Sequence, residues 1–120
     1  MGKAKSALIS QVEMVKRAIA FVNDVSREVK VEEVYVVGSR ARGDYLDTSD
    51  IDLVIISRDF EGLDYRQRVE KLSRFLRARV EFFAFTPQEW ENPSSLYVVE
   101  MKKEAIRLKD LASQLGLDTT

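Results

Sequence analysis

Apolar side chains recur along the chain with two periods, one typical of helices and one typical of strands. The helical period predicts a long amphipathic helix over residues 5–28 and a second amphipathic helix that begins near residue 65. The apolar stripe of the first helix comprises Leu8, Val12, Val15, Ile19 and Val22. That of the second helix comprises Tyr65, Val69, Leu72 and Leu76.

Runs of β-branched and aromatic residues predict the strands. They cover residues 34–37, 51–57 and 79–85, and residues 105–109 predict a further edge strand. Because side chains alternate between the two faces of a strand, the third run would place Glu81, Phe83 and Phe85 on one face. We expect the residues after the last strand to form a frayed tail.

The first two predicted strands are separated by a short segment rich in glycine and polar residues. Gly38-Ser39 ends the first strand, residues 39–42 predict one helical turn, and Gly43 closes that turn. Residues 44–49 are polar and predict a loop. So short a link favours an antiparallel pair or close neighbours in one sheet.

Two more helices are predicted after the third strand. Thr86-Pro87-Gln88-Glu89 has the pattern of a capping box with proline at the first helical position, and Ser94 is the predicted cap of a helix through Lys103. The element order α-β-β-α-β-α-(β) predicts an α/β (α+β) fold, a small mixed β-sheet packed against helices. A length of 120 residues suits a single domain over residues 1–120.

Composition narrows the chemistry available to such a domain. The chain has no histidine and no cysteine, which removes the commonest general base and all thiolate metal sites. The remaining carboxylates and hydroxyls suit a hard, oxygen-seeking ion such as magnesium. A net charge of −1 gives no overall attraction to nucleic acid or anionic membrane. No apolar run approaches ~20 residues and no signal-peptide pattern is present, so we expect a cytoplasmic protein.

Residues 65–80 form a locally basic stretch in which only Glu70 opposes the positive charges. We favour the solvated face of an amphipathic helix as its interpretation. A patch for nucleic acid or for an acidic partner is the alternative that stays open.

The Gly38-Ser39 pair lies where a strand is predicted to turn into a helix. Glycine lets the backbone approach a ligand closely, and free N–H groups at the start of a helix favour phosphate. The Ser39 hydroxyl adds a donor, and Arg40 and Arg42 add positive charge nearby. The alternative is an ordinary strand-to-helix turn capped by serine.

Three acids are the second candidate for chemistry. Asp50 and Asp52 lie one residue apart at a predicted strand, so both carboxylates would share one face. Like charges on an apolar strand repel each other, and a divalent cation would explain why they are there. Glu81 would join them if its strand lies beside that of Asp52. Otherwise Asp50 is a cap, and the other two acids face solvent.

Gly38-Ser39, ten intervening residues, Asp50-Ile51-Asp52 and an acid on a later strand together resemble the signature of the DNA polymerase beta nucleotidyltransferase superfamily. The resemblance covers residues 34–90. It is closest to the minimal nucleotidyltransferase (MNT) domain, which is often found in prokaryotes beside a HEPN-domain partner. The resemblance implies the nucleotidyltransferase fold.

The resemblance also implies a role for each of these residues. The nucleotide-binding set would be Gly38, Ser39, Arg40, Arg42 and Ser49. The catalytic and metal-binding set would be Asp50, Asp52 and Glu81, which would hold Mg²⁺ as one or two ions. The third acid of the superfamily is usually aspartate, and Glu81 departs from that pattern.

The implied reaction transfers a nucleoside monophosphate, AMP from ATP by family likeness, to an acceptor hydroxyl with release of pyrophosphate. The implied acceptor is a HEPN toxin partner, which would make the chain a protein adenylyltransferase and an antitoxin. Two alternatives stay open: a non-catalytic antitoxin that acts by contact, and a small-molecule enzyme of the aminoglycoside type. A homo-oligomer through the first helix also stays open.

Overall fold

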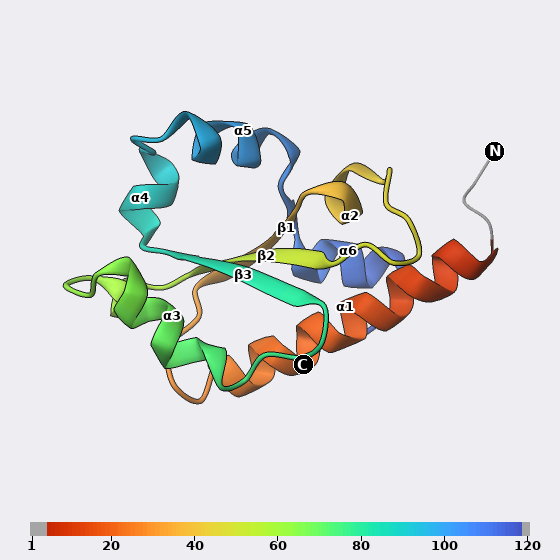
Figure 1. The fold of residues 1–120 in the computed structure, drawn as a ribbon, viewed down its shortest axis with the longest axis horizontal. Helices are drawn as coiled ribbons and strands as arrows, with labels where there is room; N and C mark the ends of the chain where they lie inside the picture. Colours follow the sequence, from red (N-terminus) through yellow and green to blue (C-terminus); the bar gives the residue numbers. More distant parts are fainter. Residues whose placement is uncertain (1–4, 119–120) are drawn as a thin grey trace.

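A four-stranded sheet lies between two layers of helices in the computed structural model, which describes residues 5–118 (Figure 1). The elements in chain order are α1 (Lys5–Val25), β1 (Glu33–Val37), α2 (Ser39–Arg42), β2 (Ile51–Ile56), the 3₁₀ helix η1 (Arg58–Phe60), α3 (Tyr65–Ser73), β3 (Val80–Phe85), α4 (Pro87–Glu91), α5 (Leu96–Glu104), β4 (Ile106–Arg107) and α6 (Leu108–Gln114). None of the helices within the described residues is long and apolar enough to cross a membrane.

The sheet has the strand order β3-β2-β1-β4 and mixed polarity. β1 pairs antiparallel with both β2 and β4, whereas β2 pairs parallel with β3. The mixed sheet and the antiparallel β1–β2 pair predicted from the sequence are therefore confirmed. The parallel β2–β3 pair requires a crossover, which η1 and α3 supply between the two strands.

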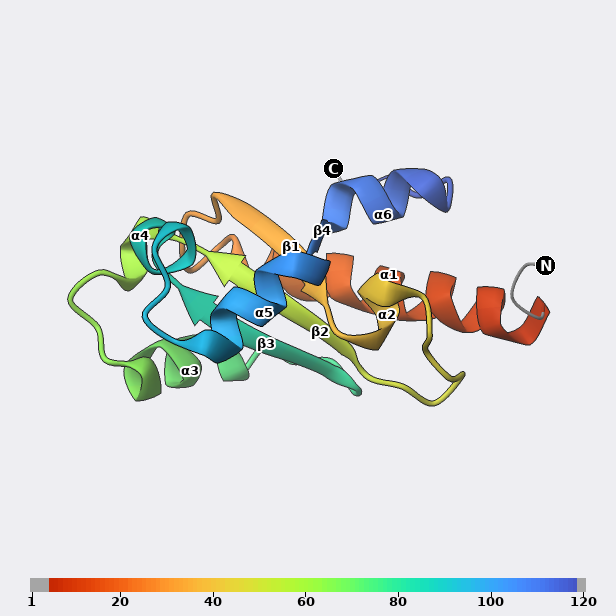
Figure 2. The ribbon, with the colours of Figure 1, turned by 90° about the horizontal axis from the view of Figure 1, so that it is seen from above.

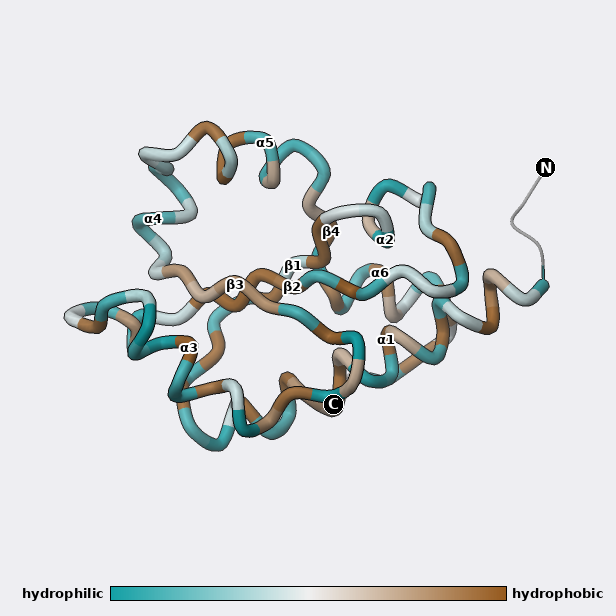
Figure 3. The backbone as a smooth tube through the Cα atoms, viewed as in Figure 1, coloured by the Kyte–Doolittle hydropathy of each residue, from teal (hydrophilic) through white to brown (hydrophobic). Residues whose placement is uncertain are grey.

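Helices cover both faces of the sheet. Viewed from above, α5 crosses in front of the strands and α1 runs behind them (Figure 2). The larger core cluster joins α1, α3 and α6 to one face, and a smaller cluster joins α4 and α5 to the other. The most hydrophobic segments follow the central strands (Figure 3), which are therefore buried on both sides.

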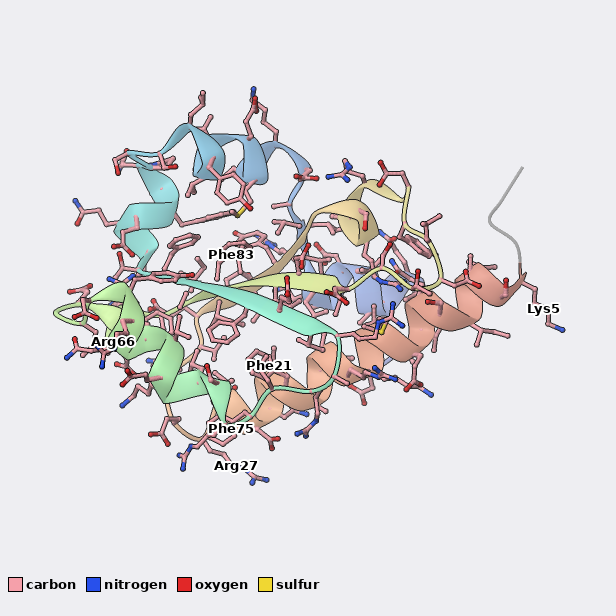
Figure 4. All side chains as sticks on the ribbon, viewed as in Figure 1. Lys5, Phe21, Arg27, Arg66, Phe75 and Phe83 are labelled. Carbon is pink, nitrogen blue, oxygen red and sulfur yellow. The ribbon has the colours of Figure 1, made fainter. Side chains whose placement is uncertain are left out.

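The alternation predicted for β3 is confirmed. Phe82 packs against Phe21 of α1, with ring centroids 5.5 Å apart, on the face of the larger cluster. Phe83 belongs to the smaller cluster and contacts Tyr97 of α5 on the opposite face. Figure 4 shows Phe21 and Phe83 on the two sides of the sheet. The face that carries Phe83 also carries Glu81, so the smaller cluster borders the acids.

Much of the predicted apolar stripe of α1 is confirmed, because Val15 is fully buried and Ile19 and Val22 pack against the larger cluster. Leu8 is 48% exposed, whereas Met14, Ala18 and Phe21 are at the centre of the packed surface. The buried face also carries Ala7, Gln11 and Ala18, which a search for large apolar side chains does not select. In α3, Leu72 of the predicted stripe is buried together with Arg68, whereas Tyr65 is exposed, as is Leu76 beyond the end of the helix.

Three predictions for the C-terminal part need correction. β4 is only two residues long, and the chain continues as α6 where a frayed tail was expected. α6 is held because Leu108, Leu111 and Ala112 are buried in the larger cluster. α5 is capped by Ser95, whose Oγ accepts from Tyr97 N at 3.2 Å, and not by Ser94. The capping box at Thr86 is confirmed.

The basic stretch is matched by acids of the same chain. The pairs are Arg66–Glu70, Arg68–Glu89, Lys71–Glu28, Arg74–Glu28, Arg77–Asp24 and Arg79–Asp50. Apart from Arg68, which is buried, this pairing supports the interpretation of residues 65–80 as the solvated face of an amphipathic helix.

Candidate functional site

Asp52 and Glu81 face each other across the parallel β2–β3 pair. Asp52 is opposite Glu81 on one side and Val37 of β1 on the other, so these residues form one row across the sheet. Gly38 follows Val37 directly and begins the turn into α2. The fold therefore brings the Gly38-Ser39 turn and two of the three predicted acids to the same edge of the sheet.

The closeness of these carboxylates changes the protonation of Asp52. Burial, followed by the charges of Glu81 and Asp50, raises the pKa of Asp52 from its ordinary value of 3.8 to about 6. A hydrogen bond with the Glu81 carboxyl group acts in the same direction. The folded chain therefore holds negative charge here at a cost, which a bound cation would remove.

Asp50 does not join this pair of acids, and its carboxylate forms an ion pair with Arg79. Its Oδ1 is 3.6 Å from Nε of Arg79, the residue before β3. Arg79 adopts a positive φ of 67°, which is uncommon for a residue other than glycine. Within residues 5–118 no three acidic, histidine or cysteine side chains lie close enough to hold a metal ion. The structure thus brings Asp52 and Glu81 together and turns Asp50 toward Arg79.

Two features of the structure require glycine at position 38: its backbone conformation and the closeness of Asp52. Its φ is 76°, in the left-handed region, and a Cβ placed there would lie 2.7 Å from Oδ2 of Asp52. A side chain at this position would therefore collide with the carboxylate. The glycine lets the turn approach Asp52 closely, as the sequence pattern indicates.

Arg40 does not fit the nucleotide-binding role expected of it. Its side chain is 2% exposed and donates to Oε1 of Gln11 at 3.0 Å and to Oγ of Ser10 at 2.9 Å. It also donates to the carbonyl of Ser49 through Nε at 3.0 Å and Nη2 at 2.8 Å. Arg40 therefore fixes the loop over residues 44–49 to α1, which places the start of β2.

Ser49 and Tyr45 also belong to this loop framework. Oγ of Ser49 accepts from the backbone N–H of Leu46 at 2.9 Å, so the hydroxyl holds the loop. Tyr45 is buried, and the Arg40 guanidinium lies 4.6 Å from the centre of its ring. These bonds hold the loop that leads into β2, and the nucleotide contact expected of Ser49 stays a prediction.

A pocket of about 300 Å³ opens beside the acidic pair. Its lining joins Gly38 and Arg42 of the turn, Asp52 and Glu81 of the strands, and one face of α5. The α5 residues are Tyr97, Glu100, Met101 and Glu104. They recur at spacings of three, one and three, which is one helical face, and that spacing was the available sequence signal for them.

Arg42 and Ser39 are the two remaining predicted contacts. Arg42 lines the pocket, and its guanidinium bonds to Asp44 at 3.2 Å and to Glu104 at 2.5 Å. Ser39 is the first residue of α2, directly after Gly38. Both positions suit contact with an anion at Gly38, and both contacts stay predictions.

Comparison with known proteins identifies the family and the fold. A family model described as a nucleotidyltransferase domain matches residues 19–108. A crystal structure of a candidate nucleotidyltransferase from Sulfolobus solfataricus is 37% identical, with 89% of each chain covered and a TM-score of 0.76. A toxin–antitoxin structure with AMP-PNP is 17% identical, with 84% of this chain and 82% of that chain covered. Its TM-score is 0.49, a likeness too weak to carry an argument. No curated protein matches the chain.

The sheet is that of a nucleotidyltransferase fold. The chain belongs to the nucleotidyltransferase domain family. The resemblance stated from the sequence is thereby confirmed at the level of the family and of the fold.

Replacing Gly38 by alanine should destabilise the protein by about 2–4 kcal/mol, because backbone strain and the collision with Asp52 add. Gly43→Ala is the matched control. Gly43 also has a positive φ, of 92°, but a Cβ there meets no atom within 4 Å, so only about 1 kcal/mol of strain is expected. Urea unfolding measures both. Equal losses would contradict the collision, as would a Gly38→Ala loss that persists fully in an Asp52→Ala background.

In metal-free protein, Asp52→Asn should raise the free energy of unfolding at neutral pH. The raised pKa means that the folded state favours protonated Asp52, so the wild type loses stability as pH rises from 3.8 through about 6. The shift corresponds to at most about 3 kcal/mol, reduced to about 1–2 kcal/mol by solvent screening. Chemical unfolding in EDTA should show this gain above pH 6 and none below pH 4. A gain independent of pH would contradict the account.

Proposed function

We propose that this chain transfers a nucleoside monophosphate from a nucleoside triphosphate, ATP by family likeness, to an acceptor hydroxyl. The observation that carries the proposal is the row formed by Asp52 and Glu81 beside the close turn at Gly38. Membership of the nucleotidyltransferase domain family supports the same reaction class.

The residues at the site fit a divalent cation. Two carboxylates lie side by side, and the pKa of Asp52 is raised by its acidic neighbours, so a cation would offset charge that the fold leaves unbalanced. Oxygen ligands of this kind suit Mg²⁺. We propose that Asp52 and Glu81 hold the ion and that Asp50 joins them by leaving Arg79. Bound there, the ion would neutralise charge that develops on the transferred phosphoryl group.

The chain's own residues would orient the reactants. The Gly38-Ser39 turn brings backbone N–H groups to the triphosphate, and Arg42 supplies positive charge from the same pocket. Glu81 is exposed at the pocket and is placed to accept the proton of the attacking hydroxyl. In-line attack then breaks the bond between the α-phosphorus and the bridging oxygen, and pyrophosphate leaves.

We further propose that the acceptor is a protein hydroxyl on a HEPN-type toxin, for which this chain would act as antitoxin. Family resemblance suggests this partner, and one feature of the surface supports a protein acceptor. Leu96 and Tyr97 are 76% and 66% exposed on α5, where Tyr97 also lines the pocket. Two exposed apolar side chains beside a pocket that four acids line suit a protein surface better than a small hydrophilic acceptor.

Incubation with ATP labelled at the α-phosphate, Mg²⁺ and a HEPN-domain partner should label the partner. Asp52→Asn should lower the rate by about 100-fold or more, because it removes an acidic ligand from the centre of the site. Asp110→Asn, which changes an exposed acid of α6, is the matched control and should leave the rate unchanged.

Equal labelling by wild type and Asp52→Asn would contradict the proposed site. If Asp52→Asn still neutralises the toxin, and neither the wild type nor the variant labels the partner, the chain is an antitoxin that acts by contact.

A further inference from the structure

The Arg42–Glu104 ion pair joins the two walls of the pocket. The residues are 62 positions apart, on α2 and at the end of α5, and Nη1 of Arg42 donates to Oε2 of Glu104 at 2.5 Å. Gly38 and Asp52 line the same pocket. The contact therefore lies across the space that a triphosphate at the Gly38-Ser39 turn would enter.

The charges around this space are unequal. Among the described residues that line the pocket, Arg42 is the one cation, against four acids: Asp52, Glu81, Glu100 and Glu104. The proposed metal ion would neutralise the charges of Asp52 and Glu81. Glu104 has a different partner, because its carboxylate accepts from Arg42 as a phosphate oxygen would.

We infer that Glu104 stands in for a nucleotide phosphate at Arg42, so that the Arg42–Glu104 pair closes the empty pocket and nucleotide binding must displace Glu104. This inference rests on the proposed function, since it concerns the triphosphate of the same site. Glu104 is a positioning residue that sets nucleotide affinity. The bond from Glu104 is also the largest cause that raises the pKa of Arg42, ahead of the bond from Asp44.

The two ends of this ion pair differ in how firmly they are held. Arg42 is tied to Asp44 through Nε at 3.2 Å, so its guanidinium keeps its position when Glu104 leaves. Glu104 is the last residue of α5, and Ala105 follows in an extended conformation. The carboxylate can therefore move away from Arg42 while Val98 and Met101 keep α5 on the sheet.

The test measures the Kd of Mg-ATP by titration calorimetry. Glu104→Gln should bind about five-fold more tightly than the wild type, because the competitor for Arg42 is removed at a cost typical of an exposed ion pair. Glu100→Gln is the matched control. Glu100 lies one turn earlier on α5, lines the same pocket and pairs with Lys103, not with Arg42. Its loss should change the Kd by less than about two-fold.

A second arm separates competition for Arg42 from general charge. In an Arg42→Gln background, Glu104→Gln should change the Kd by less than about two-fold, because the residue for which both anions compete is gone. If Glu104→Gln fails to fold, Glu104→Asp draws the carboxylate back by one methylene and should tighten binding in the same direction.

Three results overturn the inference. If the wild type binds Mg-ATP and the Glu104 variants bind it equally or more weakly, the inference is wrong and the proposed function is unaffected. Equal tightening with and without Arg42 assigns the effect to net charge alone. No binding of Mg-ATP by any chain overturns both the proposed function and the inference.

Discussion

The structure depends on a constraint that the fold alone does not explain: Asp52 and Glu81 face each other on adjacent strands at the border of an apolar cluster. Burial and repulsion raise the pKa of Asp52 to about 6, so an ionised Asp52 costs stability at neutral pH. Such a cost is typical of sites whose balance is restored by a ligand. The family, the turn at Gly38 and the pocket lined by α5 support our proposal that this pair holds a divalent cation for phosphoryl transfer.

The surrounding structure positions these acids. Gly38 lacks the Cβ that would collide with Asp52. Arg40 ties the loop that precedes β2 to α1, because it also bonds Gln11 and Ser10. Because Arg40 bonds the carbonyl of Ser49, it fixes the entry into β2 directly before Asp50. A buried guanidinium with several acceptors is a rigid anchor, and the loss of one acceptor would leave a buried N–H group unsatisfied. Gly38 and Arg40 thus position the acids through the backbone of the turn and of the loop.

The sequence predicted most of the sheet and the turn because their signals are local. The β-branched runs, the Gly38-Ser39 stop and the capping box at Thr86 each depend on a few neighbouring residues. The burial of Arg40 was not predictable, since its acceptor Gln11 lies 29 positions away and only the folded α1 brings them together. Glu104 was missed although its spacing marks one face of α5, because only the folded chain brings that face to Gly38 and Asp52. Long-range packing, which local patterns do not encode, also decided that α6 forms where a tail was expected.

Metal binding to Asp52 and Glu81 is the central claim, and Mn²⁺ titration followed by electron paramagnetic resonance tests it most directly. The wild type should bind Mn²⁺, and Asp52→Asn and Glu81→Gln should each weaken that binding by about ten-fold or more. Glu100→Gln, which removes an acid of the same pocket away from the pair, should bind Mn²⁺ nearly as the wild type does. Equal Mn²⁺ affinity in all four chains, or no binding by the wild type, would contradict the account.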